Sequence, residues 1–172
     1  MLDAGPFAEW VVAMQAGLGE GTGTDVPCDG CVACCTSGQT IVVGPDEAAA
    51  LPAAALVDLG DGDRALAHDE QGCCVLLVDG ACTAYEHRPR RCRTYDCRIF
   101  PATGLVPEDD KPAIAERAAA WRFTYDEPDD RRRQQAVHMA VVLLGNVQLE
   151  GRVTSTTQLA AAAVDAHEEF LA

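Results

Sequence analysis

The sequence predicts a small α+β fold, with short strands in a cysteine-rich N-terminal part and helices in a C-terminal part. All nine cysteines of the 172-residue chain lie within residues 28–97. The apolar run 74–78 is followed by Asp79-Gly80, a dipeptide typical of tight turns between antiparallel strands. After residue 98, apolar residues recur at the three- and four-residue spacing of helices instead.

The length of the chain favours a single domain, which we expect to span residues 1–172. Within it, we expect the cysteine-containing region at 28–97 to form the core and residues 98–172 to form a helical C-terminal extension.

The N-terminal half is expected to begin with a helix over residues 6–18. Pro6 suits the first position of a helix, and the apolar residues after it follow helical spacing. Residues 40–43 predict a short strand, and residues 44–47 open an alanine-rich helix that Pro52 kinks or divides.

The C-terminal region carries three helical patterns. One helix face is predicted to hold Ile114, Ala118, Trp121 and Tyr125. Residues 136–144 are apolar on all sides, which is typical of a buried helix, and residues 160–171 predict a last amphipathic helix. We expect these positions to be core rather than cofactor contacts.

The charge and the hydropathy of the chain argue against two classes of partner. A formal net charge of −14 disfavours a nucleic-acid surface, which needs clustered basic side chains on an accessible face. The sequence has no apolar run of about 18 residues that could span a membrane, and it lacks the pattern of a signal peptide. We therefore expect a cytoplasmic protein with reduced thiols rather than a secreted disulfide framework.

The cysteines fall into two groups. The first cysteine group contains Cys28, Cys31, Cys34 and Cys35, and the second cysteine group contains Cys73, Cys74, Cys82, Cys92 and Cys97. Thiols placed two residues apart can reach one ion, because a tight turn brings their sulfurs together. Four arginines lie within the second group, at positions 88, 90, 91 and 93, where they can offset the charge of thiolates. The sequence thus predicts a core centred on a metal ion or cluster.

The residues around these cysteines form recognisable motifs. The first group has the form Cys28-x2-Cys31-x2-Cys34-Cys35, and the second includes Cys82-Thr83-Ala84-Tyr85-Glu86-His87-Arg88-Pro89 and Cys92-Arg93-Thr94-Tyr95-Asp96-Cys97. Over about residues 28–97 the chain closely resembles the CxxCxxCC family of cysteine-cluster proteins, the YkgJ-like group of zinc- or iron-chelating domains. The resemblance implies metal binding and carries no shared reaction.

The resemblance also implies roles for individual residues. Its ligand set is Cys28, Cys31, Cys34, Cys35, Cys73, Cys82, Cys92 and Cys97, and its motif includes Tyr85, Glu86, Arg88 and Arg93, which we expect to surround and orient the ligands. Cys74 departs from the family pattern, so a buried apolar role, an alternative ligand and a reactive thiol stay open for it. His87 lies at a variable position of the motif and is more often solvated than a ligand.

A ligand set made of thiolates narrows the choice of metal. It excludes magnesium, calcium and the facial triad of non-haem iron, and leaves zinc and iron–sulfur clusters. Cys28-x2-Cys31-x2-Cys34 matches the three-cysteine run of ferredoxin-type chains, which favours a [4Fe-4S] cluster over Zn2+. The adjacent Cys34 and Cys35 point in divergent directions, which suits two neighbouring centres.

Three functions are compatible with these features. The first is a metal-binding module with a structural or electron-carrying centre. The second is an iron–sulfur- or iron-dependent enzyme, an oxidoreductase or a group-transfer catalyst, which would need an open coordination position. The third is a metal chaperone or a thiol sensor. The sequence indicates no catalytic residue and no protein partner, since it holds none of the common nucleotide-binding or hydrolase motifs.

Overall fold

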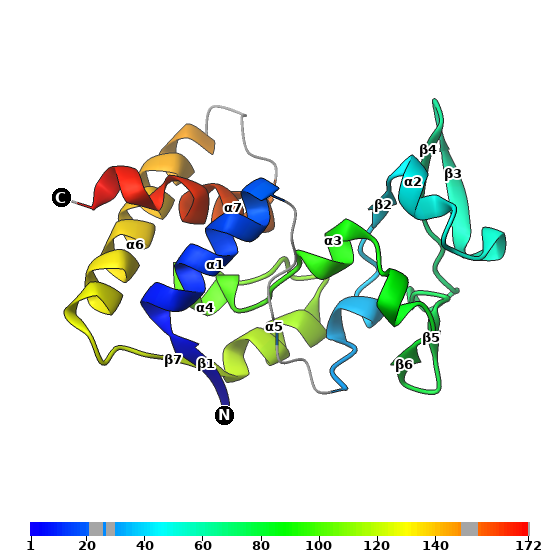
Figure 1. Ribbon diagram of the computed structural model, residues 1–172. Coiled ribbons are helices and arrows are strands. Elements are labelled where there is room, and N and C mark those ends of the chain that lie inside the picture. Colours follow the sequence, from blue (N-terminus) through cyan, green and yellow to red (C-terminus); the bar gives the residue numbers. More distant parts are fainter. Residues whose placement is uncertain (21–25, 27–29, 149–154, 172) are drawn as a thin grey trace. The chain divides into compact units, whose positions relative to one another are not determined.

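The fold is a mixture of helices and strands with a helical C-terminal region, as the sequence predicts. The structure, a computed structural model, describes residues 1–20, 26, 30–148 and 155–171 (Figure 1). The chain divides into two compact units, the helical unit (Met1–Gly21 with Asp96–Ala172) and the cysteine unit (Thr22–Tyr95). The N-terminal residues therefore belong to the same unit as the expected C-terminal extension. Among the described residues, no helix combines the length and the apolar character that a membrane crossing needs.

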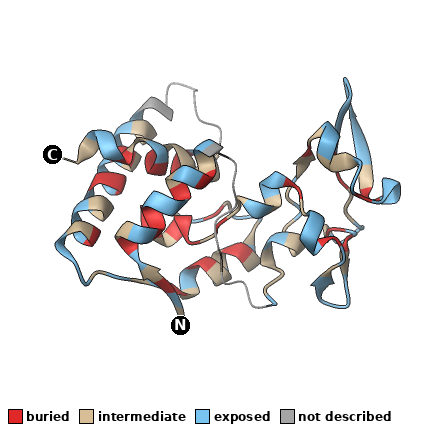
Figure 2. Ribbon diagram, in the orientation of Figure 1, coloured by how far each residue is buried: buried red, intermediate tan, exposed pale blue. Residues whose placement is uncertain are grey.

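The helical unit is built around three packed helices and a two-stranded parallel sheet. Its elements are β1 (Leu2–Pro6), α1 (Phe7–Glu20), α4 (Ile99–Thr103), α5 (Pro112–Ala120), β7 (Trp121–Thr124), α6 (Pro128–Gln148), α7 (Thr156–Ala166) and η4 (His167–Phe170). Helix α6 packs against α1, α7 and η4, and β1 pairs with β7. Figure 2 shows the buried residues of α1, α6 and α7 on the sides that face one another.

The core of the helical unit contains an aromatic cluster. The ring of Phe7 lies 5.8 Å from that of Trp10, 5.1 Å from that of Phe123 and 5.8 Å from that of Tyr125. Offset and edge-on ring pairs at such distances stabilise a core beyond the area that they bury. These contacts join the start of α1 to β7 and to the residue that follows β7. The helix expected over 6–18 is thereby confirmed, with its start at Phe7.

Two expectations for the C-terminal region are wrong. Helix α5 ends at Ala120, so Trp121 lies in strand β7 and Tyr125 lies after it, because this segment pairs with β1, a strand that the sequence did not predict. The second concerns the apolar stretch 136–144 of α6. Here Met139, Val142 and Leu143 are 53%, 64% and 49% exposed, because the partners of α6 cover only one of its sides.

The cysteine unit is made of short elements. They are η1 (Ala33–Thr36), β2 (Val42–Val43), α2 (Pro45–Ala48), η2 (Ala53–Ala55), β3 (Leu56–Gly60), β4 (Asp63–Leu66), β5 (Leu77–Val78), β6 (Ala81–Cys82), η3 (Tyr85–His87) and α3 (Arg90–Arg93). Strands β2, β4 and β3 form an antiparallel sheet in that order, and β5 pairs with β6. The predicted hairpin at Asp79-Gly80 is confirmed, since both residues have positive φ angles (50° and 77°) that fit a type I′ turn. The predicted alanine-rich helix ends at Ala48, four residues before Pro52.

A buried carboxylate connects the two longest helices of the helical unit. Asp130, in the first turn of α6, accepts hydrogen bonds from the backbone N–H of Ala8 at 2.8 Å and of Glu127 at 2.9 Å. The side chain thus satisfies one of the free N–H groups at the start of α1 and a second one before α6. These hydrogen bonds hold the pKa of Asp130 below its usual range.

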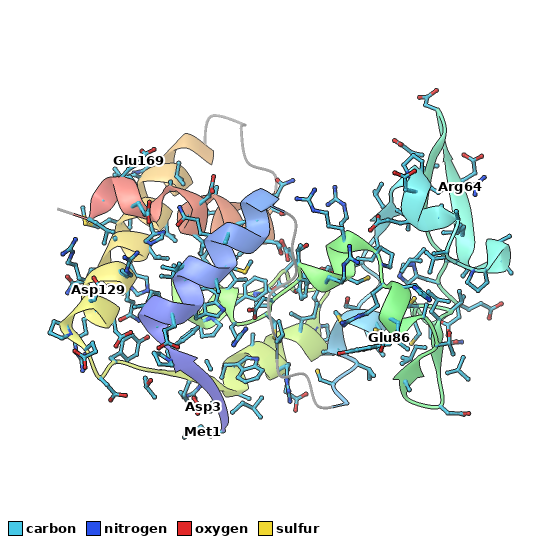
Figure 3. All side chains as sticks on the ribbon, in the orientation of Figure 1. Met1, Asp3, Arg64, Glu86, Asp129 and Glu169 are labelled. Carbon is cyan, nitrogen blue, oxygen red and sulfur yellow. The ribbon has the colours of Figure 1, made fainter. Side chains whose placement is uncertain are left out.

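We predict that Asp130→Ala lowers the free energy of unfolding by about 1–3 kcal/mol, because two partly buried N–H groups lose their acceptor. Urea unfolding at neutral pH measures the change. Asp129→Ala is the matched control, since the neighbouring Asp129 (labelled in Figure 3) makes a partly exposed ion pair with Arg133. Such a pair contributes about 0.5 kcal/mol or less. Equal losses in the two variants would contradict the capping role of Asp130.

The contribution of Asp130 is also expected to depend on pH. Because its folded pKa is lowered, the stabilisation is complete above the ordinary carboxyl pKa of about 4 and is lost as the pH falls through the lower folded value. The stability difference between the wild-type chain and Asp130→Asn should therefore shrink on acidification below about pH 4. A difference that stays constant down to pH 2 would show that the charge of Asp130 has no part in it.

Candidate metal centre

The two cysteine groups meet in the cysteine unit through the main chain. The N–H of Cys74 donates a hydrogen bond of 2.7 Å to the carbonyl of Cys35. Nearby, Gly38 and Gly72 approach closely, so that a Cβ atom on Gly72 would lie 3.7 Å from the Cα of Gly38. Both glycines have positive φ angles (64° and 81°), a conformation that side chains other than glycine rarely adopt. This backbone contact brings segment 33–36 beside the start of the second group.

Short turns place the remaining cysteines of this unit. Cys82 ends β6 and lies opposite Leu77 in the hairpin, and the N–H of the following Thr83 donates to the carbonyl of Leu76. Cys92 lies in α3, where its N–H donates to the carbonyl of Pro89 at 2.9 Å. The proline fixes the backbone at the entry of this helix.

Five thiols of the two groups lie together, and we call them the thiol cluster: Cys34, Cys35, Cys74, Cys82 and Cys92. Cys74 is buried within a small apolar core that contains Leu66 and Leu76. Cys35, Cys82 and Cys92 are partly buried and pack against this core. None of the eight cysteines that the structure describes is in a disulfide bond.

The electrostatics of the thiol cluster allow one thiolate more readily than several. Cys35 donates a side-chain hydrogen bond to Cys34, which lowers the pKa of Cys34 to about 7 and raises that of Cys35 well above its ordinary value. Burial and the neighbouring thiols raise the pKa of Cys92 to about 12, and burial raises that of Cys74. The guanidinium of Arg88 favours the thiolate in both cases: it adds to the lowering of the pKa of Cys34 and opposes the rise in the pKa of Cys92. A bound cation would supply the positive charge that several thiolates need.

Two of the remaining predicted ligands, Cys31 and Cys73, are not among the described cysteines that pack against the apolar core of the cysteine unit. Cys28 falls in a stretch that the structure does not describe. Cys31 is partly buried. Cys73 is also partly buried, and its backbone is held by Asp69: its N–H donates to the carboxylate at 2.8 Å and its carbonyl accepts from the Asp69 N–H.

Cys97 belongs to the helical unit and has its own surroundings. The indole N–H of Trp121 donates a hydrogen bond to its sulfur at 3.2 Å. Its neighbours Asp96 and Arg98 are both buried and form an ion pair at 2.7 Å. The Asp96 carboxylate also accepts from the indole N–H of Trp10 at 2.9 Å. Cys97 is therefore held in a segment that is fixed on both sides.

The residues expected to surround the ligands make mainly local contacts. Arg88 lies over the ring of Tyr85, with the guanidinium carbon 3.7 Å from the ring centre, and its Nε donates to the carbonyl of Tyr85. Glu86 and His87 are exposed on η3, and Glu86 is labelled in Figure 3. The partner of Arg93 is Glu47, at 3.7 Å.

Glu47 is a residue of this region that the sequence did not single out. One of its carboxylate oxygens accepts from the N–H of Gly44 at 3.0 Å, and the other accepts from the N–H of Arg90. The side chain thereby links α2 to the start of α3, the helix that carries Cys92. Only the glutamate at the third position of a predicted helix, a common capping position, could have indicated it.

The chemistry of the thiol cluster fits a soft metal. Sulfur donors in an apolar setting bind zinc and iron well and bind magnesium and calcium poorly. In the part of the chain that the structure describes, no three His, Cys, Asp or Glu side chains are already arranged as a metal site. The sulfur donors are thus of the type that zinc and iron prefer. Coordination of one ion would require the sulfurs to move closer together.

Comparisons with known proteins agree with this donor set. Residues 27–120 match the family model CxxCxxCC, described as a "putative zinc- or iron-chelating domain". Searches of curated proteins and of solved structures give no match. The family match covers more than half of the 172 residues and includes all cysteines from Cys28 to Cys97. The chain therefore belongs to the CxxCxxCC family.

Proposed function

We propose that the protein is a metal-binding module whose cysteine thiolates hold an iron–sulfur cluster or zinc in a structural or electron-carrying role. The observation that carries this proposal is the thiol cluster, in which Cys74 lies within one small apolar core, Cys35, Cys82 and Cys92 pack against that core, and Cys34 is hydrogen-bonded to Cys35. Several of these thiols can ionise side by side only when a cation offsets their charge, because burial and neighbouring thiols raise their pKa values. The family match supports metal binding independently.

The proposed ligands in the cysteine unit include Cys74. Its side chain lies in the apolar core against which the partly buried Cys35, Cys82 and Cys92 pack, and its N–H fixes the position of Cys35. Among the described residues, Cys73 is neither part of this core nor packed against it. The structure therefore favours Cys74 over Cys73 as the ligand from this dipeptide, whereas the family resemblance favours the reverse. Cys28, Cys31 and Cys97 stay in the proposed ligand set because the family pattern includes them.

Iron–sulfur remains the preferred centre because of the three-cysteine run that starts at Cys28. Anaerobic purification followed by metal analysis and an absorption spectrum tests the choice. A broad visible absorption with bound iron and sulfide is expected for a [4Fe-4S] cluster. Stoichiometric zinc in a colourless protein would support the alternative, and a chain that binds neither metal would overturn the proposal.

One observation favours a second function, a thiol sensor or metal carrier. Cys34 is exposed, and the hydrogen bond from Cys35 lowers its pKa to about 7, which gives a reactive thiolate at neutral pH. A carrier must release its ion readily. Release to a chelator within seconds would favour this function, whereas retention for hours would favour a structural or electron-carrying centre.

The adjacent cysteines provide a matched pair of variants. We predict that Cys74→Ser loses at least half of the bound metal, because the buried thiol lies in the core against which Cys35, Cys82 and Cys92 pack. Cys73→Ser should keep its metal, since this side chain is not part of the cluster. Metal content per chain after purification measures both. Metal loss confined to Cys73→Ser would show that the ligand register suggested by the family resemblance is correct.

Metal removal is expected to loosen the cysteine unit before the helical unit. The apolar core of the cysteine unit is small, so the free energy of metal binding contributes to its folding. We predict that chelation increases amide hydrogen exchange over residues 73–95 while the amides of α6 and α7 stay protected. Full protection of residues 73–95 in the metal-free chain would contradict this coupling.

A further inference from the structure

Trp121 makes an uncommon choice of hydrogen-bond partner. Its side chain is 2% exposed at the start of β7, so its indole N–H needs an acceptor inside the protein. The acceptor is the sulfur of Cys97, at 3.2 Å. A neutral thiol accepts weakly, whereas a thiolate accepts strongly, because hydrogen bonds to charged groups are about twice as strong as those between neutral groups. This contact therefore suits a sulfur that acts as a metal ligand.

The surroundings of this contact are rigid and positively charged. The guanidinium carbon of Arg98 lies 5.9 Å from the centre of the Trp121 ring, and that of Arg117 lies 5.0 Å from it. The Nε and Nη2 atoms of Arg98 donate hydrogen bonds to the carboxylate of Asp96, at distances of 2.7–3.0 Å. The indole is thus fixed beside Cys97 by its own burial and by two cations on its ring. A fixed donor can orient the sulfur without loss of side-chain freedom on metal binding.

We propose that Trp121 is a positioning residue for Cys97, whose indole N–H orients the sulfur and withdraws electron density from it when it binds the metal. This inference rests on the proposed function, because it takes Cys97 to be a ligand. Hydrogen bonds from residues behind a ligand commonly change metal affinity about 10- to 100-fold. Hydrogen bonds to ligand sulfurs are also among the factors that set the potential of iron–sulfur clusters.

Trp10 provides the matched control. It is also a buried indole of the helical unit, 4% exposed, but its N–H donates to Asp96 instead of to the neighbouring Cys97. Trp121→Phe and Trp10→Phe each remove one buried N–H and keep an aromatic ring. Only the first removes the hydrogen bond to sulfur.

The test is a titration of the full-length, metal-free chain with Co2+, whose thiolate complexes have sulfur-to-metal charge-transfer absorption. Trp121→Phe is expected to weaken Co2+ binding about 10-fold or more, because the sulfur loses the donor that orients it. The charge-transfer band should move to longer wavelength, because the sulfur becomes a better electron donor without the hydrogen bond. Trp10→Phe should change neither quantity. Equal effects of the two variants, or no band shift in Trp121→Phe, would overturn the inference.

A double-mutant cycle separates positioning from general destabilisation. In a Cys97→Ser background, Trp121→Phe should have no further effect on Co2+ affinity or on the band, because the sulfur that it acts on is gone. An undiminished effect in that background would show that Trp121 acts through the fold alone. A wild-type chain that gives no charge-transfer band with Co2+ would overturn the proposed function itself, and the role of Trp121 with it.

Discussion

The hydrogen bond from the N–H of Cys74 to the carbonyl of Cys35 is the constraint on which the cysteine unit depends. The two cysteine groups are far apart in sequence, and this bond, with the close approach of Gly38 and Gly72, joins them. Closing such a loop has an entropic cost, which a few backbone contacts and one small apolar core must offset. A metal that binds thiols from both groups would add the largest favourable contribution to that balance.

The thiol cluster also shows how packing and charge oppose each other. Burial of Cys35, Cys74 and Cys92 in apolar surroundings favours neutral thiols, whereas metal coordination requires thiolates. Cys34 differs because it is exposed and accepts a hydrogen bond from Cys35. A metal ion would therefore bind the ionised Cys34 first. The positive charge of the ion would then favour the loss of protons from the buried thiols.

Local sequence predicted the elements that depend on local chemistry. The positive φ angles of Asp79 and Gly80 and the spacing of apolar residues in α1 are such cases. Strand β7 was not predicted, because it forms by pairing with β1 at the other end of the chain. For the same reason, no sequence pattern could show that Cys74 rather than Cys73 joins the core against which Cys82 and Cys92 pack, or that Glu47 would hold the start of α3. These contacts depend on which segments meet in the fold.

The positions of Trp10 and Trp121 have a practical consequence for measurements of folding. They are the two tryptophans of the chain, and both lie in the helical unit next to Asp96 and Cys97. Tryptophan fluorescence therefore reports the helical unit, whereas the cysteine unit contributes only tyrosine emission. An unfolding curve followed by tryptophan fluorescence alone would miss a separate transition of the cysteine unit, which circular dichroism would detect.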